Sequence, residues 1–170
     1  EGHTERYIFG FEESYGYLTG SYVRDKDGVD GAYMICEMFS YYATKGISLL
    51  DKLDELYKTY GYCLNTLHSY EFDGSAGFAK MQSIMQAFRG NIKAFGGKKV
   101  VKLLDYAYGL DGLPKSEVLK FLLEDNCSIV VRPSGTEPKL KIYISVSAEN
   151  REAAEKVECE IVKGAEKWFA

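Results

Sequence analysis

The stretch RPSGT, residues 132–136, gathers side chains that proteins commonly use to hold a phosphate group. The guanidinium of Arg132 offers a planar fork of N–H donors that fits two phosphate oxygens at once. Two hydroxyl side chains add further donors, and a glycine lets the backbone come close to a ligand. The pattern predicts a phosphate-binding loop whose ligands are Arg132, Ser134, Gly135 and Thr136.

The same residues also suit a simple turn between two strands. Proline, serine and glycine are common in hairpin loops, and Glu137 follows immediately, where it could pair with Arg132. The G-x-x-x-x-G-K-[ST] spacing of a Walker loop is absent. The residues by themselves therefore leave two interpretations open, a turn and a phosphate loop.

A second candidate is the stretch GFEESYGY, residues 10–17, in which acids and a hydroxyl lie among glycines and aromatic rings. In an extended backbone, Glu12 and Ser14 project to the same side. A carboxylate beside a hydroxyl suits the adjacent hydroxyl groups of a sugar. Sequence neighbours do not provide the opposed carboxyls of a glycosidase, and Ser14 has no evident histidine partner that would make it a nucleophile. The alternative interpretation is a strand-end turn with two solvated acids.

A third charged stretch is RDKDG, residues 24–28. It resembles a calcium loop only superficially, because Val29 stands where an EF-hand needs a ligand. The ordinary interpretation is a charged turn that caps the helix that follows it.

Composition limits the classes of protein to be considered. The chain has 170 residues, of which 46% are hydrophobic and 27% charged, as in ordinary globular domains. Its net charge of −4 provides no general attraction to nucleic acid, and no apolar run is long enough for a membrane span. Four separated cysteines without a C-x-x-C pair indicate reduced, mostly buried thiols. We therefore expect a cytoplasmic protein with neither nucleic-acid nor membrane partners.

The first third of the chain has the pattern of a strand followed by two helices. Residues 7–9 predict a short buried strand that runs into a loop over residues 10–17. Residues 30–44 are apolar on almost every side, which predicts a helix buried on several faces and stopped by Gly46. Ser48 and Asp51 form the capping box of a second helix, which Gly61 ends. This order indicates the tail of an α/β domain with a boundary near Gly61.

The rest of the chain has the pattern of an α+β layer. Strands are expected over residues 63–72, 100–106, 117–124 and 128–131, and most clearly over residues 140–146, where apolar and polar residues alternate. A helix is expected to start at residues 73–75, and a last helix near Asn150. The first of these helices has an apolar face formed by Phe78, Met81, Met85 and Phe88, and the second has one formed by Ala154, Val157, Ile161, Ala165 and Trp168.

Three motifs together, GFEESYGY, VRDKDG and RPSGTEPKLKIY, resemble the C-terminal portion of an α-D-phosphohexomutase, of the phosphoglucomutase/phosphomannomutase superfamily. The resemblance covers essentially the whole chain, and the form with Phe11 after Gly10 is most like the broad phosphoglucomutase branch. It implies that residues 1–61 are the C-terminal part of an α/β domain 3. It also implies that residues 62–170 are domain 4, an α+β, TATA-box-binding-protein-like domain with an antiparallel sheet and two helices.

The resemblance also implies an activity for the parent enzyme, an isomerase that acts as an intramolecular phosphotransferase. Such enzymes interconvert hexose 1-phosphate and hexose 6-phosphate through a bisphosphate intermediate, with Mg²⁺ and glucose 1,6-bisphosphate as cofactors. By position, Glu12 and Ser14 would bind sugar hydroxyls. Residues 132–136 would bind the phosphate of the phosphosugar substrate, and Arg24 and Lys26 would supply positive charge to the cleft.

Two motifs of that family are absent from this sequence, namely the phosphoserine loop and the Asp-rich magnesium loop. We therefore expect no catalytic residue and no metal ligand in this chain, and no activity without the N-terminal domains of the same polypeptide. Alternatives within the superfamily are a phosphopentomutase or a sugar-bisphosphate synthase. Alternatives outside it are a phosphosugar-binding module without chemistry and an interaction domain that uses the 14 tyrosines.

Overall fold

The computed structural model describes residues 2–12, 15–135 and 137–169. The chain divides into two compact units, Glu1–Leu56 and Tyr57–Ala170. Within the described residues, no helix combines the length and apolar character needed to cross a membrane.

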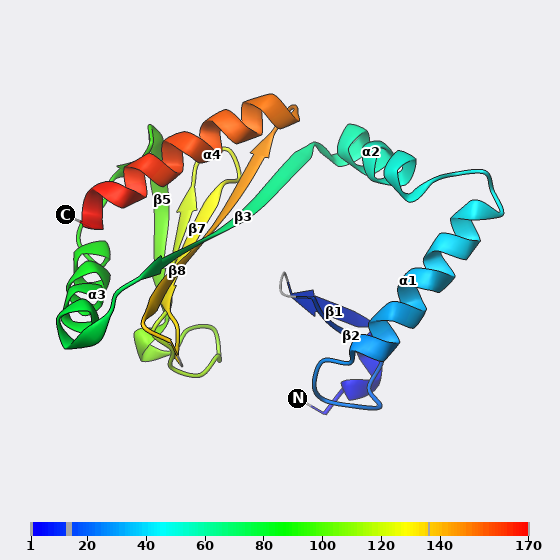
Figure 1. Ribbon diagram of the computed structural model, residues 1–170, viewed down its shortest axis with the longest axis horizontal. Helices are drawn as coiled ribbons and strands as arrows, with labels where there is room; N and C mark the ends of the chain where they lie inside the picture. The colour runs from blue at the N-terminus through cyan, green and yellow to red at the C-terminus, as the bar shows by residue number, and fades with distance from the viewer. Residues whose placement is uncertain (1, 13–14, 136, 170) are drawn as a thin grey trace. The chain divides into compact units, whose positions relative to one another are not determined.

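The first unit contains a β-hairpin and helices, drawn in blue and cyan in Figure 1. The two strands of the hairpin are antiparallel and pair from Phe9 opposite Thr19 to Glu12 opposite Gly16. In chain order the elements are η1 (Thr4–Arg6), β1 (Phe9–Glu12), β2 (Gly16–Thr19), α1 (Gly28–Ala43) and α2 (Leu49–Tyr60), the last of which runs on into the second unit.

The predicted buried strand over residues 7–9 is wrong in both position and environment. The strand begins at Phe9, and residues 10–12 and 16–17 of the stretch expected to be a loop belong to the two strands of the hairpin. The apolar side chains expected to be buried here are exposed, since Ile8, just before β1, is 82% accessible and Phe11, within β1, is 74% accessible. The helix expected over residues 30–44 is present as α1, but the expectation that it is buried on several faces is wrong, because Gly31 is its only described residue that is buried. An apolar pattern marks a face that can be buried, but burial requires a second layer over that face.

Close backbone packing fixes the hairpin against the start of α1. A Cβ atom on Gly31 would lie 2.9 Å from the Cβ of Tyr17, so only glycine lets the helix approach the strand. The carboxylate of Asp30 accepts hydrogen bonds from the backbone N–H of Thr19, at 3.1 Å, and from its hydroxyl. The backbone N–H of Asp27 donates to the carbonyl of Tyr17 at 2.8 Å. These contacts place the charged turn at residues 24–27 beside the hairpin.

The helix ends of the first unit follow their local sequence signals. Asp27 is the N-cap of α1, as the charged turn predicted, and its Oδ1 accepts from the backbone N–H groups of Val29 and Asp30 at 2.9 and 3.1 Å. The predicted capping box of α2 is confirmed, since Asp51 N donates to Ser48 Oγ at 3.1 Å and Ser48 N donates to Asp51 Oδ2 at 3.2 Å.

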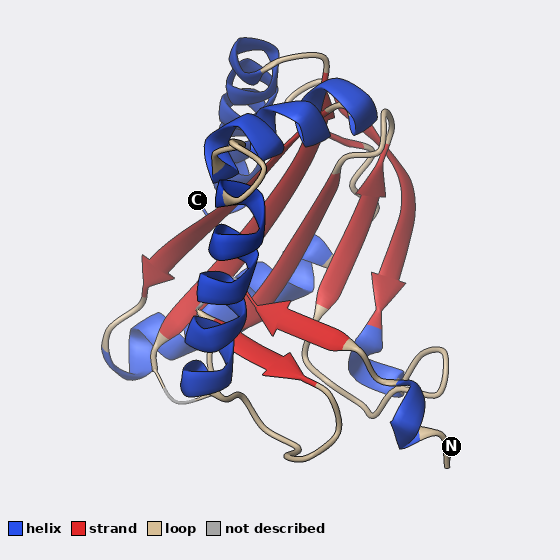
Figure 2. Cartoon of the chain, turned by 90° about the vertical axis from the view of Figure 1, so that its right-hand side faces the viewer, coloured by secondary structure: helices blue, strands red, loops and turns tan. Residues whose placement is uncertain are grey.

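The second unit is a six-stranded antiparallel sheet with its two α-helices on one face. The strand order is β3-β8-β7-β6-β5-β4, and the alternating strand directions can be followed in Figure 2. This architecture confirms the predicted α+β domain. Its elements are β3 (Tyr62–Glu71), α3 (Gly74–Phe88), β4 (Ala94–Phe95), β5 (Lys98–Asp105), η2 (Tyr106–Tyr108), β6 (Leu119–Leu123), β7 (Ser128–Pro133), β8 (Lys139–Ala148), α4 (Arg151–Glu166) and η3 (Lys167–Phe169).

The core lies between the two helices and one face of the sheet. On β8 the predicted alternation is confirmed, because Leu140, Ile142, Ile144 and Val146 are all at most 1% exposed. The opposite face of the sheet bears the residues that alternate with this apolar row, and neither helix contributes to a core there. We call it the open face.

Two predicted core residues are exposed. Phe78 is 56% accessible, and Ile84 lines the core instead. Helical spacing indicates which side of α3 is apolar. It does not indicate how much of the helix length is covered by the sheet, and Phe78 lies near the start of α3, outside the covered part. Trp168 is 39% accessible, while Phe169 packs against the core. The α-helix ends at Glu166 and continues as a 3₁₀ turn, whose tighter winding moves each following side chain to a different direction.

The expectation of mostly buried cysteines is also wrong. Cys127 is buried, whereas Cys36, Cys63 and Cys159 are exposed, and all four are free thiols. Cys63 alternates with inward-facing residues on β3 and so lies on the open face.

We predict that the core of the second unit depends strongly on Leu119, which is fully buried on β6. Leu119→Ala should lower the free energy of unfolding by about 2–5 kcal/mol, because it removes buried methyl groups and leaves a cavity. The matched control Leu113→Ala, at a side chain 56% exposed, should change it by less than about 0.5 kcal/mol. Urea denaturation followed by circular dichroism measures both. Equal losses in the two variants would contradict the proposed core.

We also predict a pH-dependent cap at α1. The Tyr22 hydroxyl donates to Asp27 Oδ2 at 2.6 Å, and this bond, followed by that from the Asp30 N–H, lowers the pKa of Asp27. The same bond, helped by desolvation and the charge of Asp27, raises the pKa of Tyr22 to about 12. The stabilisation that Asp27 gives is therefore complete above its pKa in the unfolded chain, and it is lost as the pH falls through its pKa in the folded chain. The stabilisation that Tyr22 gives is complete below about pH 10 and is lost as the pH rises from about 10 toward 12.

The variant Tyr22→Phe should raise the pKa of Asp27 toward its ordinary value. An NMR titration of the aspartate carboxyl carbons measures this shift directly. The control Tyr33→Phe removes the hydroxyl of another exposed tyrosine of the same unit and should leave Asp27 unchanged. An unchanged pKa of Asp27 in Tyr22→Phe would rule out the cap as described.

Candidate functional site

In the first unit, the structure brings together two of the predicted site residues, Glu12 and Lys26. Lys26 Nζ donates to Glu12 Oε1 at 2.7 Å, across the end of the hairpin. Both side chains are about half exposed, so the pair is accessible to a ligand. Arg24 lines the same hollow of about 280 Å³, together with residues of both strands.

Gly16 makes room for this ion pair. It lies opposite Glu12 in the hairpin register, and a Cβ atom on it would lie 2.6 Å from Glu12 Oε1 and would also collide with the Lys26 side chain. The glycine therefore lets the carboxylate and the amine fold over the backbone of β2. The predicted site residue Ser14 lies outside the described residues, as does Glu13.

In the second unit, the candidate phosphate loop is the connection between β7 and β8. Arg132 and Pro133 end β7, and β8 begins at Lys139 and runs antiparallel to it. The hairpin interpretation of this stretch is thus correct for the backbone, which does not exclude a ligand at its tip. Thr136, a predicted ligand, lies outside the described residues.

The described part of the loop is anchored on both sides, and Gly135 within it is exposed. Ser134 N donates to the Lys139 carbonyl at 2.7 Å, and the Pro138 carbonyl accepts from Phe72 N at 2.8 Å. Gly135 is exposed, and a Cβ atom built on it would meet none of the described atoms within 4 Å beyond its chain neighbours. Packing within the described protein therefore does not require glycine here, and the space beside it is accessible to a ligand.

The alternative in which Glu137 neutralises Arg132 is not observed. Glu137 lies 3.3 Å from Lys139 Nζ, and Glu71 lies 3.2 Å from the same amine. Hydrogen bonds to Glu71 and Glu137 raise the pKa of Lys139. Arg132 forms no ion pair with any residue that the structure describes, so its guanidinium remains available to an anion.

Sequence reasoning missed Lys141 as a member of this site. In the β7–β8 register, Lys141 lies directly opposite Arg132, and both alternate with buried residues, so both belong to the open face. Among the described residues Lys141 has no ion-pair partner either. Like charges at directly opposed positions destabilise a sheet unless an anion lies between them. The alternation of residues 140–146 put Lys141 on the correct face, but only the strand register shows its neighbour.

The described residues do not form a metal site. No group of three or more His, Cys, Asp or Glu side chains in this part of the chain could hold a metal ion. They therefore do not fit the Mg²⁺ that the resemblance implies for a full-length enzyme.

Comparison with known protein families agrees with the two units. The family described as phosphoglucomutase/phosphomannomutase, alpha/beta/alpha domain III, matches residues 1–60. The family described as phosphoglucomutase/phosphomannomutase, C-terminal domain, matches residues 75–163.

Individual relatives of this chain are phosphoglucomutases as well. Phosphoglucomutase of Staphylococcus aureus strain MSSA476 is 41% identical over 155 residues, which are 84% of this chain and 28% of that protein. The enzyme of strain USA300 is 39% identical over the same length, and that of strain MRSA252 is 40% identical over 151 residues. The chain thus spans 28% of the length of the curated relatives that it matches first.

A solved structure with the same fold is the open form of the exocytosis-sensitive phosphoprotein pp63/parafusin, a phosphoglucomutase from Paramecium. It aligns with a TM-score of 0.65 at 20% identity, over 93% of this chain and 29% of that one. With the two domain matches and the phosphoglucomutase relatives, these similarities show that the chain belongs to the phosphoglucomutase/phosphomannomutase family, of which it matches the C-terminal portion.

Proposed function

We propose that this chain is the substrate-holding C-terminal half-site of a phosphoglucomutase, which interconverts hexose 1-phosphate and hexose 6-phosphate through a bisphosphate intermediate. The observation that carries the proposal is the pair of cations formed by Arg132 and Lys141. They lie opposite each other on the open face, beside the exposed Gly135. The names of the relatives support the hexose phosphate as substrate.

Phosphate binding would relieve the charge at this site. A phosphate monoester carries close to two negative charges at neutral pH, which matches the two cations. The Arg132 guanidinium can donate two parallel N–H···O bonds, while Lys141 acts as a point charge. Backbone N–H groups of the loop, with Ser134 and Thr136, would complete the shell around the phosphate oxygens.

Sugar binding is assigned to Glu12 and Ser14 of the first unit. The carboxylate of Glu12 accepts hydrogen bonds, as sugar hydroxyls require. Lys26, at 2.7 Å from it, holds that carboxylate in one orientation, and Arg24 adds positive charge to the same hollow. Two carboxylate oxygens leave acceptor capacity for a ligand beside the ion pair.

In the whole enzyme, these groups would act by positioning. Phosphoryl transfer depends mainly on orientation and on neutralisation of charge, and binding of the phosphate that is not transferred contributes when it is stronger in the transition state. The phosphoserine, Mg²⁺ and glucose 1,6-bisphosphate belong to the same proposal, as do the cytoplasmic location and the division into domain 3 (residues 1–61) and domain 4 (residues 62–170).

The first unit also supports partnership with further domains of one polypeptide. Phe11, Met34, Ile35 and Met38 line an apolar hollow of about 550 Å³ on the hairpin and α1. Exposed apolar surface of this kind marks a face that another element covers. In a longer polypeptide we assign that role to the rest of domain 3.

We predict that phosphate binding to the 170-residue chain requires both cations. In an amide NMR titration with inorganic phosphate or glucose 6-phosphate, the largest shifts should centre on Ser134 and Gly135. Arg132→Gln and Lys141→Gln should each weaken binding about tenfold, because each removes a charged hydrogen bond of about 1.5 kcal/mol. Glucose 6-phosphate, but not inorganic phosphate, should also shift amides near Glu12.

The matched control is Lys102→Gln. Lys102 is an exposed lysine of the open face on β5, two strands away from β7, and its loss should leave the affinity unchanged. If Lys102→Gln weakens binding as much as Arg132→Gln, the effect is one of general charge and the proposed clamp is wrong. Absence of any shift in the loop would also overturn it.

We further predict that the chain by itself does not convert glucose 1-phosphate to glucose 6-phosphate, because its sequence lacks the phosphoserine and magnesium motifs. A coupled dehydrogenase assay with added Mg²⁺ and glucose 1,6-bisphosphate measures the conversion. The variant Arg132→Gln, purified in parallel, controls for a contaminating host enzyme. Turnover present with the native sequence and lost in the variant would contradict this division of roles.

A further inference from the structure

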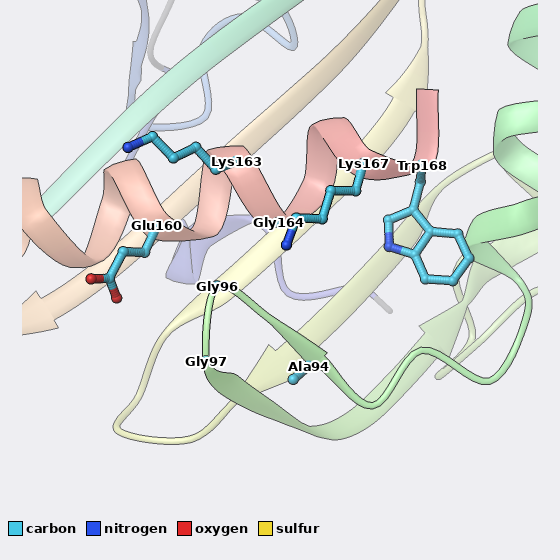
Figure 3. A pocket seen from close by; sticks show the side chains of 8 residues that line it. All are labelled: Ala94, Gly96, Gly97, Glu160, Lys163, Gly164, Lys167 and Trp168. Carbon is cyan, nitrogen blue, oxygen red and sulfur yellow. The ribbon is translucent and has the colours of Figure 1, made fainter. Parts of the chain in front are cut away.

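A third hollow lies on the helix-covered side of the sheet, where α4 meets the turn between β4 and β5. Its volume is about 670 Å³, and Figure 3 shows its lining from close by. The lining residues are Ala94, Gly96, Gly97, Glu160, Lys163, Gly164, Lys167 and Trp168.

Glycines at the crossing of turn and helix form the floor of this hollow. A Cβ atom on Gly96, which has φ +54°, would collide with the carbonyl of Glu160, and one on Gly164 would collide with the backbone of Gly96. The two backbones therefore touch, and no side chain rises from the crossing. The charged and aromatic side chains of α4 and η3 surround a floor that consists of backbone atoms.

One cation of the lining points into the hollow. In Figure 3 the amine of Lys167 points toward the Gly96–Gly97 turn, whereas the amine of Lys163 points away from that turn, and the carboxylate of Glu160 lies at the far end. Lys167 forms no ion pair with a residue that the structure describes. Its amine is therefore available to an anion in the hollow.

An aromatic surface lies beside Lys167. Trp168 is 39% exposed, and its indole stands next to Lys167 at the edge of the hollow. The 3₁₀ turn gives the core position to Phe169 instead, so packing of the core does not account for the tryptophan. An exposed indole offers a flat face on which another ring stacks.

We propose that this hollow binds a small phosphate monoester that carries a ring. The ring stacks on Trp168, the phosphate is held by Lys167, and Glu160 accepts a hydrogen bond from an amino or hydroxyl group of the ring. A nucleoside monophosphate and a sugar phosphate share this chemistry. The site is separate from Arg132 and Lys141, which lie on the open face, and it has no part in the proposed transfer reaction.

Tryptophan fluorescence tests the proposal directly, because Trp168 is the single tryptophan of the chain. The 170-residue protein is titrated with AMP, glucose 6-phosphate, adenosine and inorganic phosphate, with the indole N–H signal in NMR as a second readout. A saturable change is expected with AMP or glucose 6-phosphate, and whichever acts identifies the ring. Adenosine and inorganic phosphate should each bind at least about tenfold more weakly, since each lacks one of the two interactions.

Two variants separate this site from the phosphate loop. The variant Lys167→Gln changes an exposed side chain and should weaken the response of Trp168 about tenfold. Lys163→Gln is its matched control on the same helix, and it should leave the response unchanged because the Lys163 amine points away from the hollow. Arg132→Gln should also leave that response unchanged, even though it weakens binding at the loop. The proposal is overturned if neither phosphate ester changes either readout, if Lys167→Gln responds like the native chain, or if Arg132→Gln abolishes the response.

Discussion

Burial of a single face of the six-stranded sheet is the constraint on which the rest of the second unit depends. Because side chains alternate along a strand, each residue committed to the core places its neighbour on the open face. Val131 is buried next to Arg132, and Leu140 and Ile142 are buried on either side of Lys141. A slip of one residue between β7 and β8 would turn one of the two strands over and bury its cation, so the apolar core itself holds both cations at the surface.

Charge is distributed in opposite ways at the two candidate loops. Near the candidate phosphate loop, Lys139 pairs with both Glu71 and Glu137, and neither Arg132 nor Lys141 has a carboxylate partner among the residues that the structure describes. At the hairpin, Lys26 is already paired with Glu12. The first arrangement leaves positive charge at the surface, whereas the second holds a carboxylate beside an amine. The proposed binding of a phosphosugar rests on these two properties.

Glycine has a different role in each part of the molecule. At Gly16 it makes room for an ion pair of side chains, and at Gly96 and Gly164 it lets a turn and a helix touch. At Gly135 no described neighbour requires it. Close approach by protein explains the first three positions, and the phosphate site that we propose would explain the fourth.

Local signals in the sequence determined the caps at Asp27, Ser48 and Asn150, the alternation of β8 and the motifs that indicate the family. These depend on residues a few positions apart, and backbone geometry alone relates such neighbours. The tertiary structure alone decided that Lys141 faces Arg132, that Glu137 pairs with Lys139, and that Trp168 and the apolar face of α1 are exposed. Register, ion-pair partners and burial arise from contacts between distant segments, which no local pattern specifies.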